Sequence, residues 1–360
     1  MQIKSFPSLT DQLSNTQKMT YITSLLKTQS KNGKPKQEET LSEELDEFLT
    51  SLPKEKGWRT PNLFLFQGYW CQPQEIRAII STQNHFKAQD SDLILASIPK
   101  SGTTWLKALT FAIVNRNKFS VQPKNLHHPL LTQNPHELVP FLEYKLYADC
   151  NRLPDLSLLS SPRLVATHVP FVALPDSVNT TNCKIVYICR NPFDTFVSIW
   201  HYLGKIRPES LGPLPFEEAF DLYCRGVIGF GPYWDHMLGY WKESLERPDK
   251  VLFLKYEDMK VDMCGQLKKL AEFLGFAFTE EEEKGGMIED ISSLCSFQNM
   301  KDLQVNKKGK GAISNYENSD LFRKGEIGDW VNYFTPSMFE RLSNVMEEKL
   351  EGSGLTFTVC

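Results

Sequence analysis

The sequence of 360 residues lacks the features that mark membrane and secreted proteins. No apolar run approaches the roughly 18 residues that a membrane-spanning helix needs, and no apolar region of the signal-peptide kind lies near the N-terminus. The formal net charge of −4 is small for this length, so we expect neither nucleic acid nor a membrane as a partner. Hydrophobic residues make up 41% of the chain, which is enough for a sizeable core.

The cysteines show no metal-binding or redox spacing. Eight of them are scattered along the chain, and no Cys-x-x-Cys pair occurs. Oxidised pairing is one interpretation, but reduced thiols in a cytoplasmic protein fit this pattern better. The sequence predicts no metal site.

The N-terminal segment is polar and has no arginine. Residues 1–37 contain six Lys and a single acidic residue, with many Ser, Thr and Gln. A transit peptide is one interpretation, but such peptides are rich in arginine. We therefore expect residues 1–40 to be a disordered or peripheral segment, and residues 41–360 to form a single domain.

Helical and strand patterns alternate from Pro73 onward. Short apolar strands are predicted over 92–98, 163–167, 184–189 and 251–255. Helices are predicted over 41–50, 73–81, 104–116, from 192, near 265–274 and over 336–349. This alternation predicts an α/β fold with a mostly parallel central sheet and helices on both faces.

Two segments do not fit the alternation. The aromatic stretch from Trp58 to Trp70 has no clean period, and it could be a flap on the core or part of an apolar pocket. Residues 305–320 are polar and contain glycine, which is typical of a lid or a disordered loop.

The loop from Pro99 to Trp105 is the most informative segment. It follows a predicted buried strand and leads into a helix, so its backbone N–H groups should face an anion. A nucleotide-binding P-loop has the pattern Gly-x-x-x-x-Gly-Lys-Ser/Thr. Here the first glycine is missing, and Lys100 precedes Gly102 instead of following it. The loop should therefore hold an anion other than the triphosphate of ATP or GTP.

Three further predicted strands end in reactive or anion-binding residues, namely His168, Arg190 and Tyr256. Ligands of open α/β sheets bind at the carboxyl ends of the strands, so these residues should share one site with the loop. Arg190 stands where a P-loop NTPase would carry an aspartate for Mg²⁺, and its guanidinium would bind a phosphate directly. A surface salt bridge is the alternative interpretation of Arg190.

Two other features admit more than one interpretation. Arg323 and Lys324 precede Gly325 and could clamp a phosphate, or could form an exposed basic turn. His168 could accept a proton from a hydroxyl group near neutral pH, or could be a hydrogen-bonded structural residue.

Taken in order, these motifs resemble those of the cytosolic sulfotransferases. The resemblance spans roughly residues 58–356 and rests on Pro99–Trp105, Thr167-His168, Arg190-Asn191-Pro192 with Ser198, Tyr256-Glu257-Asp258, and Arg323-Lys324-Gly325 with Gly328-Asp329-Trp330. The plant enzymes are most similar. Among them, hydroxyjasmonate sulfotransferases match best over Ile98–Thr110, Asn134–Tyr147, Cys189–Tyr202 and Ala219–Trp241, and flavonol sulfotransferases are near relatives.

The resemblance implies a P-loop-like sulfotransferase fold over residues 41–360. It also implies 3′-phosphoadenosine 5′-phosphosulfate (PAPS) as the donor, no metal, and a small hydroxylated acceptor. The residues that would hold the 5′-phosphosulfate are Lys100, Ser101, Gly102, Thr103, Thr104 and Trp105. The adenine would lie near Trp105, Tyr256 and Phe297, and the residues that would hold the 3′-phosphate are Arg190, Ser198, Arg323, Lys324 and Gly325. His168 would be the catalytic base, assisted by Lys100.

The sequence departs from the family at two places. Ala166 stands where many animal members carry a second lysine before the catalytic histidine, so that lysine's role is absent here. The usual dimer motif is reduced to Thr335 and Glu340, with Val331 and Pro336 at its other places, so we expect a monomer or a weak homodimer.

The acceptor is less constrained than the donor. The implied acceptor is 11- or 12-hydroxyjasmonate, with a flavonol, another phenol or a steroid as alternatives. The candidates for its pocket are Phe141, Tyr144, Tyr147, His201, Tyr202 and the Trp58–Trp70 stretch, with Lys145 as a cation for a carboxylate. A P-loop kinase or NTPase, which would bind ATP with Mg²⁺, and a nucleotide-dependent binding protein without turnover are the rival functions.

Overall fold

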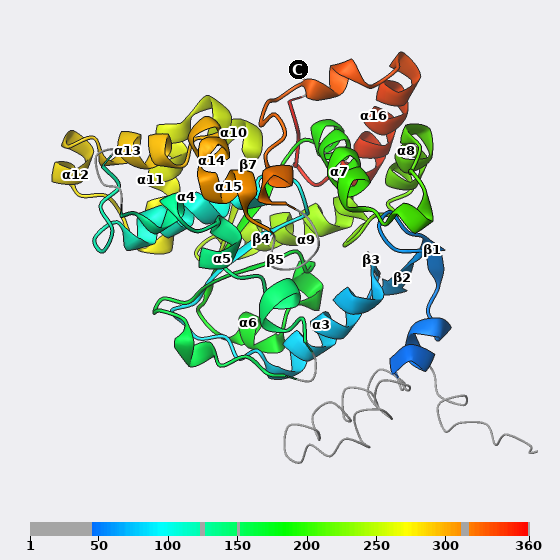
Figure 1. Ribbon diagram of the computed structural model, residues 1–360, viewed down its shortest axis with the longest axis horizontal. Coiled ribbons are helices and arrows are strands. Elements are labelled where there is room, and N and C mark those ends of the chain that lie inside the picture. Colours follow the sequence, from blue (N-terminus) through cyan, green and yellow to red (C-terminus); the bar gives the residue numbers. More distant parts are fainter. Residues whose placement is uncertain (1–44, 123–126, 150–151, 311–316, 359–360) are drawn as a thin grey trace, which may run out of the picture.

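A parallel sheet of four strands lies at the centre of the computed structural model, which describes residues 45–122, 127–149, 152–310 and 317–358 (Figure 1). The strand order is β5–β4–β6–β7. These strands are β4 (Leu93–Ser97), β5 (Leu164–Thr167), β6 (Lys184–Cys189) and β7 (Val251–Lys255). The prediction of a mostly parallel sheet is confirmed, and the strand ends lie within one residue of those predicted.

Helices cover both faces of this sheet, as predicted. Side chains along a strand alternate between the two faces. Accordingly, Ile94 and Ala96 of β4 belong to one apolar cluster, and Leu93 and Leu95 belong to the other. The first cluster is completed by α3 (Pro73–His85), α6 (Asp176–Thr180), α7 (Pro192–Ile206), α8 (Phe216–Cys224), α9 (Tyr233–Glu246) and α16 (Pro336–Leu350). The second is completed by α4 (Thr103–Asn115), α10 (Tyr256–Val261), α11 (Met263–Leu274) and α13 (Met287–Leu294).

The two clusters lie on opposite faces of one sheet. The remaining short elements are α5 (Pro135–Leu138), α12 (Glu280–Lys284), α14 (Phe297–Asp302), α15 (Gln304–Lys308), η2 (Pro129–Leu131), η3 (Leu142–Leu146), η4 (Leu156–Leu158), η5 (Phe171–Ala173), η6 (Glu209–Leu211), η7 (Asn318–Leu321) and η8 (Asp329–Asn332). Residues 1–40, predicted as a disordered or peripheral segment, lie outside the described residues. Of the helix predicted over 41–50, residues 41–44 also lie outside them, and residues 45–51 are helical.

The aromatic stretch before α3 forms a second, antiparallel sheet that the sequence did not predict. Its strands are β1 (Lys54–Lys56), β2 (Asn62–Phe66) and β3 (Tyr69–Cys71). Gln67 and Gly68 join β2 to β3 with φ values of 51° and 86°, which is the backbone of a tight hairpin. Trp58 packs inward and donates from Nε1 to the carbonyl oxygen of Val227 at 2.8 Å. This sheet thus closes one side of the core.

The polar segment 305–320 is more ordered than predicted where it is described. Its ends form α15 and η7, and the buried Asn318 donates from Nδ2 to the carbonyl oxygen of Val305 at 3.0 Å. Buried amide groups that are paired with backbone can order a segment that lacks apolar residues. Residues 311–316 lie outside the described part of the chain.

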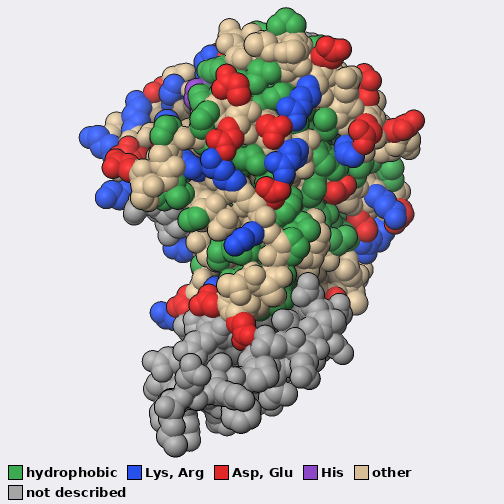
Figure 2. Space-filling model, turned by 90° about the vertical axis from the view of Figure 1, so that its right-hand side faces the viewer, with side chains coloured by type: hydrophobic (Ala, Val, Ile, Leu, Met, Phe, Trp, Pro, Cys, Tyr) green, Lys and Arg blue, Asp and Glu red, His purple; other side chains and the backbone are tan. Residues whose placement is uncertain are grey.

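The mixed charges on the surface and the free thiols both fit the composition of the chain. On the face shown in Figure 2, basic and acidic side chains are interspersed. The cysteines within the described ranges, at positions 71, 183, 189, 224, 264 and 295, are free thiols. No helix among the described residues is long and apolar enough to cross a membrane.

Candidate functional site

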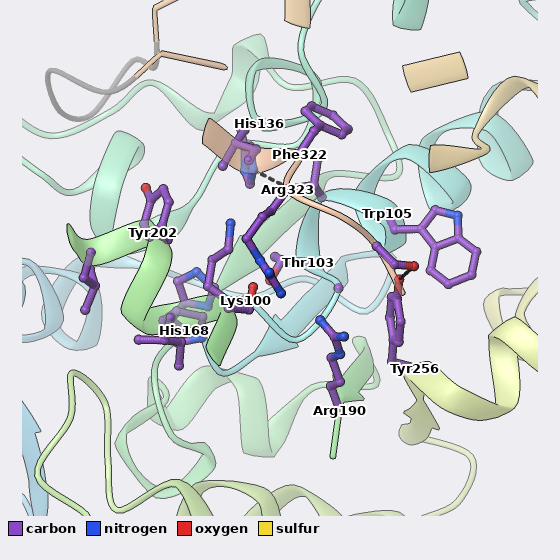
Figure 3. A pocket seen from close by; sticks show the side chains of 18 of the residues that line it. Lys100, Thr103, Trp105, His136, His168, Arg190, Tyr202, Tyr256, Phe322 and Arg323 are labelled. Carbon is purple, nitrogen blue, oxygen red and sulfur yellow. Dashed lines mark hydrogen bonds between the residues drawn. The ribbon is translucent and has the colours of Figure 1, made fainter. Parts of the chain in front are cut away.

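A cavity of about 360 Å³ lies at the carboxyl ends of the parallel strands. The loop after β4, His168 after β5, Arg190 after β6 and Tyr256 after β7 all line it (Figure 3). The four strand ends therefore meet in one site, as the sequence predicts. The volume is in the range of small-molecule sites.

Backbone geometry shapes the loop between β4 and α4. Gly102 has a φ of +106°, and a Cβ atom there would lie 2.9 Å from the ring of Tyr256. Only glycine fits both the left-handed backbone and this close approach. Below the loop, the hydroxyls of Ser97 and Thr103 lie 2.6 Å apart. The loop thus starts α4 at Gly102 without a side-chain cap, so the first N–H groups of the helix are left for a ligand.

Lys100 is the loop's cation. Its ammonium lies 4.3 Å from the ring centroid of Tyr202. Burial, together with the nearby Arg323 and Arg190, lowers the pKa of Lys100 to about 7. Burial and the neighbouring cations both disfavour the charged form of Lys100, and a bound anion would relieve both effects.

A second group of cations faces the same end of the cavity. Arg190 is only 6% exposed, and its guanidinium carbon lies 4.8 Å from the ring centroid of Tyr256. Arg190 contacts Asp194 at 3.3 Å and donates to the carbonyl oxygen of Glu326. The predicted salt bridge therefore exists, but Arg190 is buried at the cavity and not on the surface.

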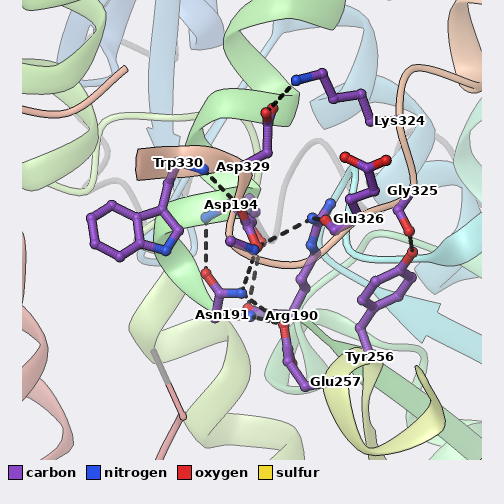
Figure 4. A network of polar contacts seen from close by, with 12 residues as sticks. Arg190, Asn191, Asp194, Tyr256, Glu257, Lys324, Gly325, Glu326, Asp329 and Trp330 are labelled. Atoms are coloured by element: carbon purple, nitrogen blue, oxygen red, sulfur yellow. Dashed lines mark hydrogen bonds and ion pairs between the residues drawn. The ribbon is translucent and has the colours of Figure 1, made fainter. Parts of the chain in front are cut away.

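A polar network holds the 323–330 segment against the sheet (Figure 4). Asp194 on α7 accepts from the backbone N–H groups of Gly328 at 2.8 Å and Trp330 at 3.1 Å. Asp329 pairs with both Arg323 and Lys324. These contacts bring Arg323, Lys324 and Gly325 to the cavity from a place in the chain more than one hundred residues after Arg190.

Several polar atoms at this end of the cavity lack a partner. They are buried and belong to Ser101 (Oγ), Trp105 (Nε1), Arg190 (Nε) and Arg323 (Nε). Buried donors are rarely left unpaired in folded proteins, and a missing partner of this kind indicates a ligand with acceptor atoms. Ser101 lies just behind the lining; the other three line the cavity.

Aromatic rings border the cationic groups. The ring centroids of Trp105 and Tyr256 lie 5.3 Å apart, and the Tyr256 hydroxyl donates to the carbonyl oxygen of Gly325 at 2.9 Å. Gly325 has a φ of +69°, and a Cβ atom there would lie 2.5 Å from the ring of Phe297. A planar group could bind among these three rings.

His168 is held in one tautomer. Its Nδ1 lies 2.7 Å from the carbonyl oxygen of Ser97, which can only accept, so the ring proton is on Nδ1. Nε2 is then the atom able to take up a proton. Burial lowers the pKa of His168 to about 3, although the bond to Ser97 opposes this shift. At neutral pH the ring is uncharged, as a general base must be. The structural and the catalytic interpretation of His168 are thus compatible.

The cavity extends from His168 toward the small antiparallel sheet. This part is lined by Trp58, Arg59, Leu63, Gln72, Glu75, Phe141, Tyr144, Tyr202 and Phe230. Of the predicted acceptor residues, Trp58, Phe141, Tyr144 and Tyr202 are therefore in place. Three others are not, because Tyr147 packs on Phe86 in the core, His201 pairs with Tyr333 at 2.9 Å, and Lys145 is exposed on the surface.

Comparison with known proteins decides the family. The chain matches the sulfotransferase domain over residues 90–354. It is 59% identical over 324 residues to cytosolic sulfotransferase 15 of Arabidopsis thaliana (90% of each chain), and 61% identical over 331 residues to cytosolic sulfotransferase 14 of the same plant (91% of this chain, 95% of the relative). This chain belongs to the plant cytosolic sulfotransferase family. It is thus a transferase of sulfuryl groups, and not a P-loop kinase or NTPase.

Solved sulfotransferases share its fold. A crystal structure of an Arabidopsis thaliana sulphotransferase is 42% identical, with a TM-score of 0.70 over 89% of this chain and 97% of that one. Mouse sulfotransferase SULT7A1, complexed with PAP, is 27% identical, with a TM-score of 0.62 over 81% of this chain and 95% of that one. These matches confirm the P-loop-like sulfotransferase fold, and the family name agrees with the predicted cytoplasmic location.

All but one of the donor-site residues assigned from the sequence line the sulfotransferase cavity. The exception is Ser101, a loop residue that is wholly buried and does not line the cavity. Ser198 on α7 lines the cavity beside Arg190 without a hydrogen bond to it. Among the described residues, no group of three or more His, Cys, Asp or Glu side chains could hold a metal ion.

Some polar residues of this sulfotransferase site were not assigned a role from the sequence. Arg59 belongs to the predicted Trp58–Trp70 stretch but was not singled out, and Gln72 and Glu75 lie at the start of α3. Lys107 is the only charged residue of α4, which is a signal that the sequence did offer. His136 also lines the cavity, and its contacts are described below.

Proposed function

We propose that this sulfotransferase transfers the sulfuryl group of PAPS to a hydroxyl group of a small acceptor that also carries a carboxylate, such as hydroxyjasmonate. The unpartnered donors of Trp105, Arg190 and Arg323 carry the donor half of this proposal. They surround one end of the cavity, where a nucleotide with phosphates at both its 3′ and 5′ positions would supply the acceptor atoms. The PAP bound in mouse SULT7A1, a relative at 27% identity, supports the same donor.

The residues divide between the two ends of such a donor. The loop residues Lys100–Trp105 lie beside His168 and fit the 5′-phosphosulfate, while Arg190, Ser198, Arg323, Lys324 and Gly325 fit the 3′-phosphate. Trp105, Tyr256 and Phe297 border the second group, where the adenine would bind. This division places the sulfuryl group next to the base.

Each side chain has a distinct task in the transfer. As in phosphoryl transfer, negative charge builds up on the departing oxygen. Lys100 and the N–H groups at the start of α4 can neutralise that charge. His168 Nε2 can take the proton from the acceptor hydroxyl as its oxygen attacks sulfur.

Arg59 supports a carboxylate on the acceptor. Its side chain is 15% exposed and lines the acceptor end of the cavity, about which the aromatic rings of Phe141, Tyr144 and Phe230 also gather. Its Nε donates to Gln72 Oε1 at 3.1 Å, and Nη2 lies 3.9 Å from Glu75 Oε1. Glu75 is already satisfied by Gln72 and Tyr144, and burial raises its pKa. The remaining N–H groups of Arg59 are thus able to bind a second carboxylate in bidentate form.

The test is turnover with PAPS and a panel of acceptors: hydroxyjasmonic acid, its methyl ester, a flavonol and a steroid. Mass spectrometry should show a product heavier by one SO₃ group. We expect the highest kcat/KM for the free acid, and Arg59→Gln should remove the preference for acid over ester, with a loss of about tenfold or more on the acid alone.

The control for this substitution is Arg77→Gln, which removes an arginine from α3 whose partner, Asp46, lies outside the cavity. Equal kcat/KM for acid and ester in the wild-type protein would overturn the carboxylate assignment. A flavonol or steroid preferred over both would favour the alternative acceptors, and no turnover with any acceptor would overturn the activity itself.

A further inference from the structure

A wholly buried lysine lies behind the loop that would hold the 5′-phosphosulfate. Lys107 is on α4, one turn after Thr104, and its side chain is inaccessible to solvent. Its ammonium nitrogen lies 2.9 Å from Nδ1 of His136 and 3.2 Å from the ring centroid of Phe141. Buried lysines are rare, and one without a directly paired carboxylate requires an explanation.

His136 connects this lysine to the cavity. Its Nε2 lies 3.0 Å from Oγ1 of Thr104, and both His136 and Thr104 line the cavity. The imidazole stacks on Phe141 with centroids 5.2 Å apart. Asn134 fixes the backbone, because its Oδ1 accepts from the N–H group of His136 at 2.9 Å. Lys107, His136 and Thr104 thus form a continuous chain of hydrogen bonds.

The chemistry of these groups determines which way the protons point. In its ammonium form Lys107 has only donors, so Nδ1 of His136 then accepts from it. Burial lowers the pKa of His136 well below its usual value, so the ring is neutral and its one proton is on Nε2. Nε2 therefore donates to the hydroxyl oxygen of Thr104. The hydroxyl hydrogen of Thr104 is then free to point into the cavity.

We propose that Lys107, acting through His136, is a positioning residue that turns the Thr104 hydroxyl hydrogen toward the 5′-phosphate end of the donor. This rests on the donor assigned under the proposed function. Without the ammonium, His136 can carry its proton on Nδ1, and Nε2 then accepts from Thr104. The hydroxyl hydrogen would in that case point away from the anion, and one hydrogen bond to the donor would be lost.

Burial disfavours the ammonium form of Lys107, and three features of its surroundings favour it. Burial lowers the pKa of Lys107 well below its usual value, whereas Glu143 acts in the opposite direction. The ring face of Phe141 also favours the charged form. An anion bound at the loop adds to these favourable interactions, so donor binding and the ammonium form of Lys107 stabilise each other.

The test compares two nucleotides that differ only in the 5′-phosphate: adenosine 3′,5′-bisphosphate (PAP) and adenosine 3′-phosphate. Isothermal titration calorimetry gives the Kd of each for the full chain and for Lys107→Met. We expect Lys107→Met to weaken PAP binding about tenfold and to leave adenosine 3′-phosphate unchanged. The exposed Lys118, just beyond α4, supplies the control, since Lys118→Met removes the same charge and should alter neither Kd.

A double-mutant cycle then tests the path of the effect. Thr104→Val removes the hydroxyl, so the addition of Lys107→Met to this variant should weaken PAP binding little further. Thr104→Ser keeps the hydroxyl and should keep the full dependence on Lys107. If Lys107→Met does not fold, His136→Met breaks the same chain at its middle and should give the same selective loss of PAP affinity.

Each outcome bears on the proposal. Unchanged PAP binding in Lys107→Met overturns it, as does an equal loss for both nucleotides, which would indicate a general disturbance of the site. Additive effects of Lys107→Met and Thr104→Val overturn the route through Thr104. A wild-type protein that binds neither nucleotide overturns the assigned donor, and the role of Lys107 toward that donor with it.

Discussion

Nδ1 of His168 lies 2.7 Å from the carbonyl oxygen of Ser97, the last residue of β4. The same strand end continues into the loop that carries Lys100, so one piece of backbone positions both the proposed base and the proposed cation. Glu143 accepts from the backbone N–H group of His168 at 2.7 Å, and Nε2 of His236 donates to the carbonyl oxygen of His168 at 2.9 Å. With these three atoms held, the ring presents Nε2 to the cavity in a fixed direction.

Replacement of His168 by Ala should remove the base and spare the donor site. We expect kcat to fall by about 10²–10⁴-fold, with the Kd for PAP within about threefold of wild type. Stopped assays for the sulfated product and calorimetry with PAP measure the two quantities. The exposed His127 gives the control His127→Ala, which should keep full activity. An active His168→Ala enzyme would exclude His168 as the base.

The pH dependence of kcat/KM should reflect Lys100 more than His168. The pKa of Lys100 is lowered to about 7, so the free enzyme loses this charge, and with it affinity for an anionic donor, as the pH rises through 7. The pKa of His168 is lowered to about 3, so the base stays unprotonated, and kcat/KM should hold, down to pH 5. Lys100→Arg keeps its charge at high pH and should give a flatter profile between pH 7 and 9. A wild-type profile that is level to pH 9 would contradict this assignment.

Arg323 should determine selectivity for the 3′-phosphate. Its buried Nε has no partner, although Asp329 pairs with Nη1. Arg323→Met should weaken PAP binding by about 10- to 100-fold and leave adenosine 5′-phosphate, which lacks the 3′-phosphate, nearly unchanged. Arg152, exposed on the surface, provides the control Arg152→Met. An equal loss of affinity for both nucleotides would show that Arg323 does not determine selectivity for the 3′-phosphate.

The sequence predicted the parts of the site that depend on strand ends. After its first residue the strand Lys184–Cys189 is apolar, because both of its faces are buried, and its end at Arg190 follows directly. The sequence of the loop from Pro99 to Trp105 indicates the geometry of the loop, because Gly102 is needed for a positive φ. Each of these signals is local. The residues that carry them meet because the carboxyl ends of parallel strands lie at one edge of the sheet.

The acceptor end could not be predicted in the same way. Arg59 lies in the connection between β1 and β2, whose strands are too short to show a period, and Glu75 lies in the first turn of α3. Lys145 and His201 lie next to Tyr144 and Tyr202 in sequence, yet their side chains point elsewhere, because neighbours on one short helical turn face different directions. The contact of Lys107 with His136 joins two helices 29 residues apart in sequence, which no local pattern specifies.

Substitution of Gly102 should separate backbone geometry from side-chain chemistry at the loop. Gly102→Ala places a Cβ atom 2.9 Å from the ring of Tyr256 and forces a non-glycine residue to a φ of +106°. The backbone strain alone costs about 1–2 kcal/mol, and a shifted Tyr256 would disturb the rings that border the donor. We expect a lower Tm and PAP binding weakened at least tenfold. Gly204→Ala on α7, where nothing lies within 4 Å of the added Cβ, should instead be neutral or stabilising by about 0.5–1 kcal/mol. Equal behaviour of the two variants in both measurements would show that the left-handed turn at Gly102 is not required for donor binding.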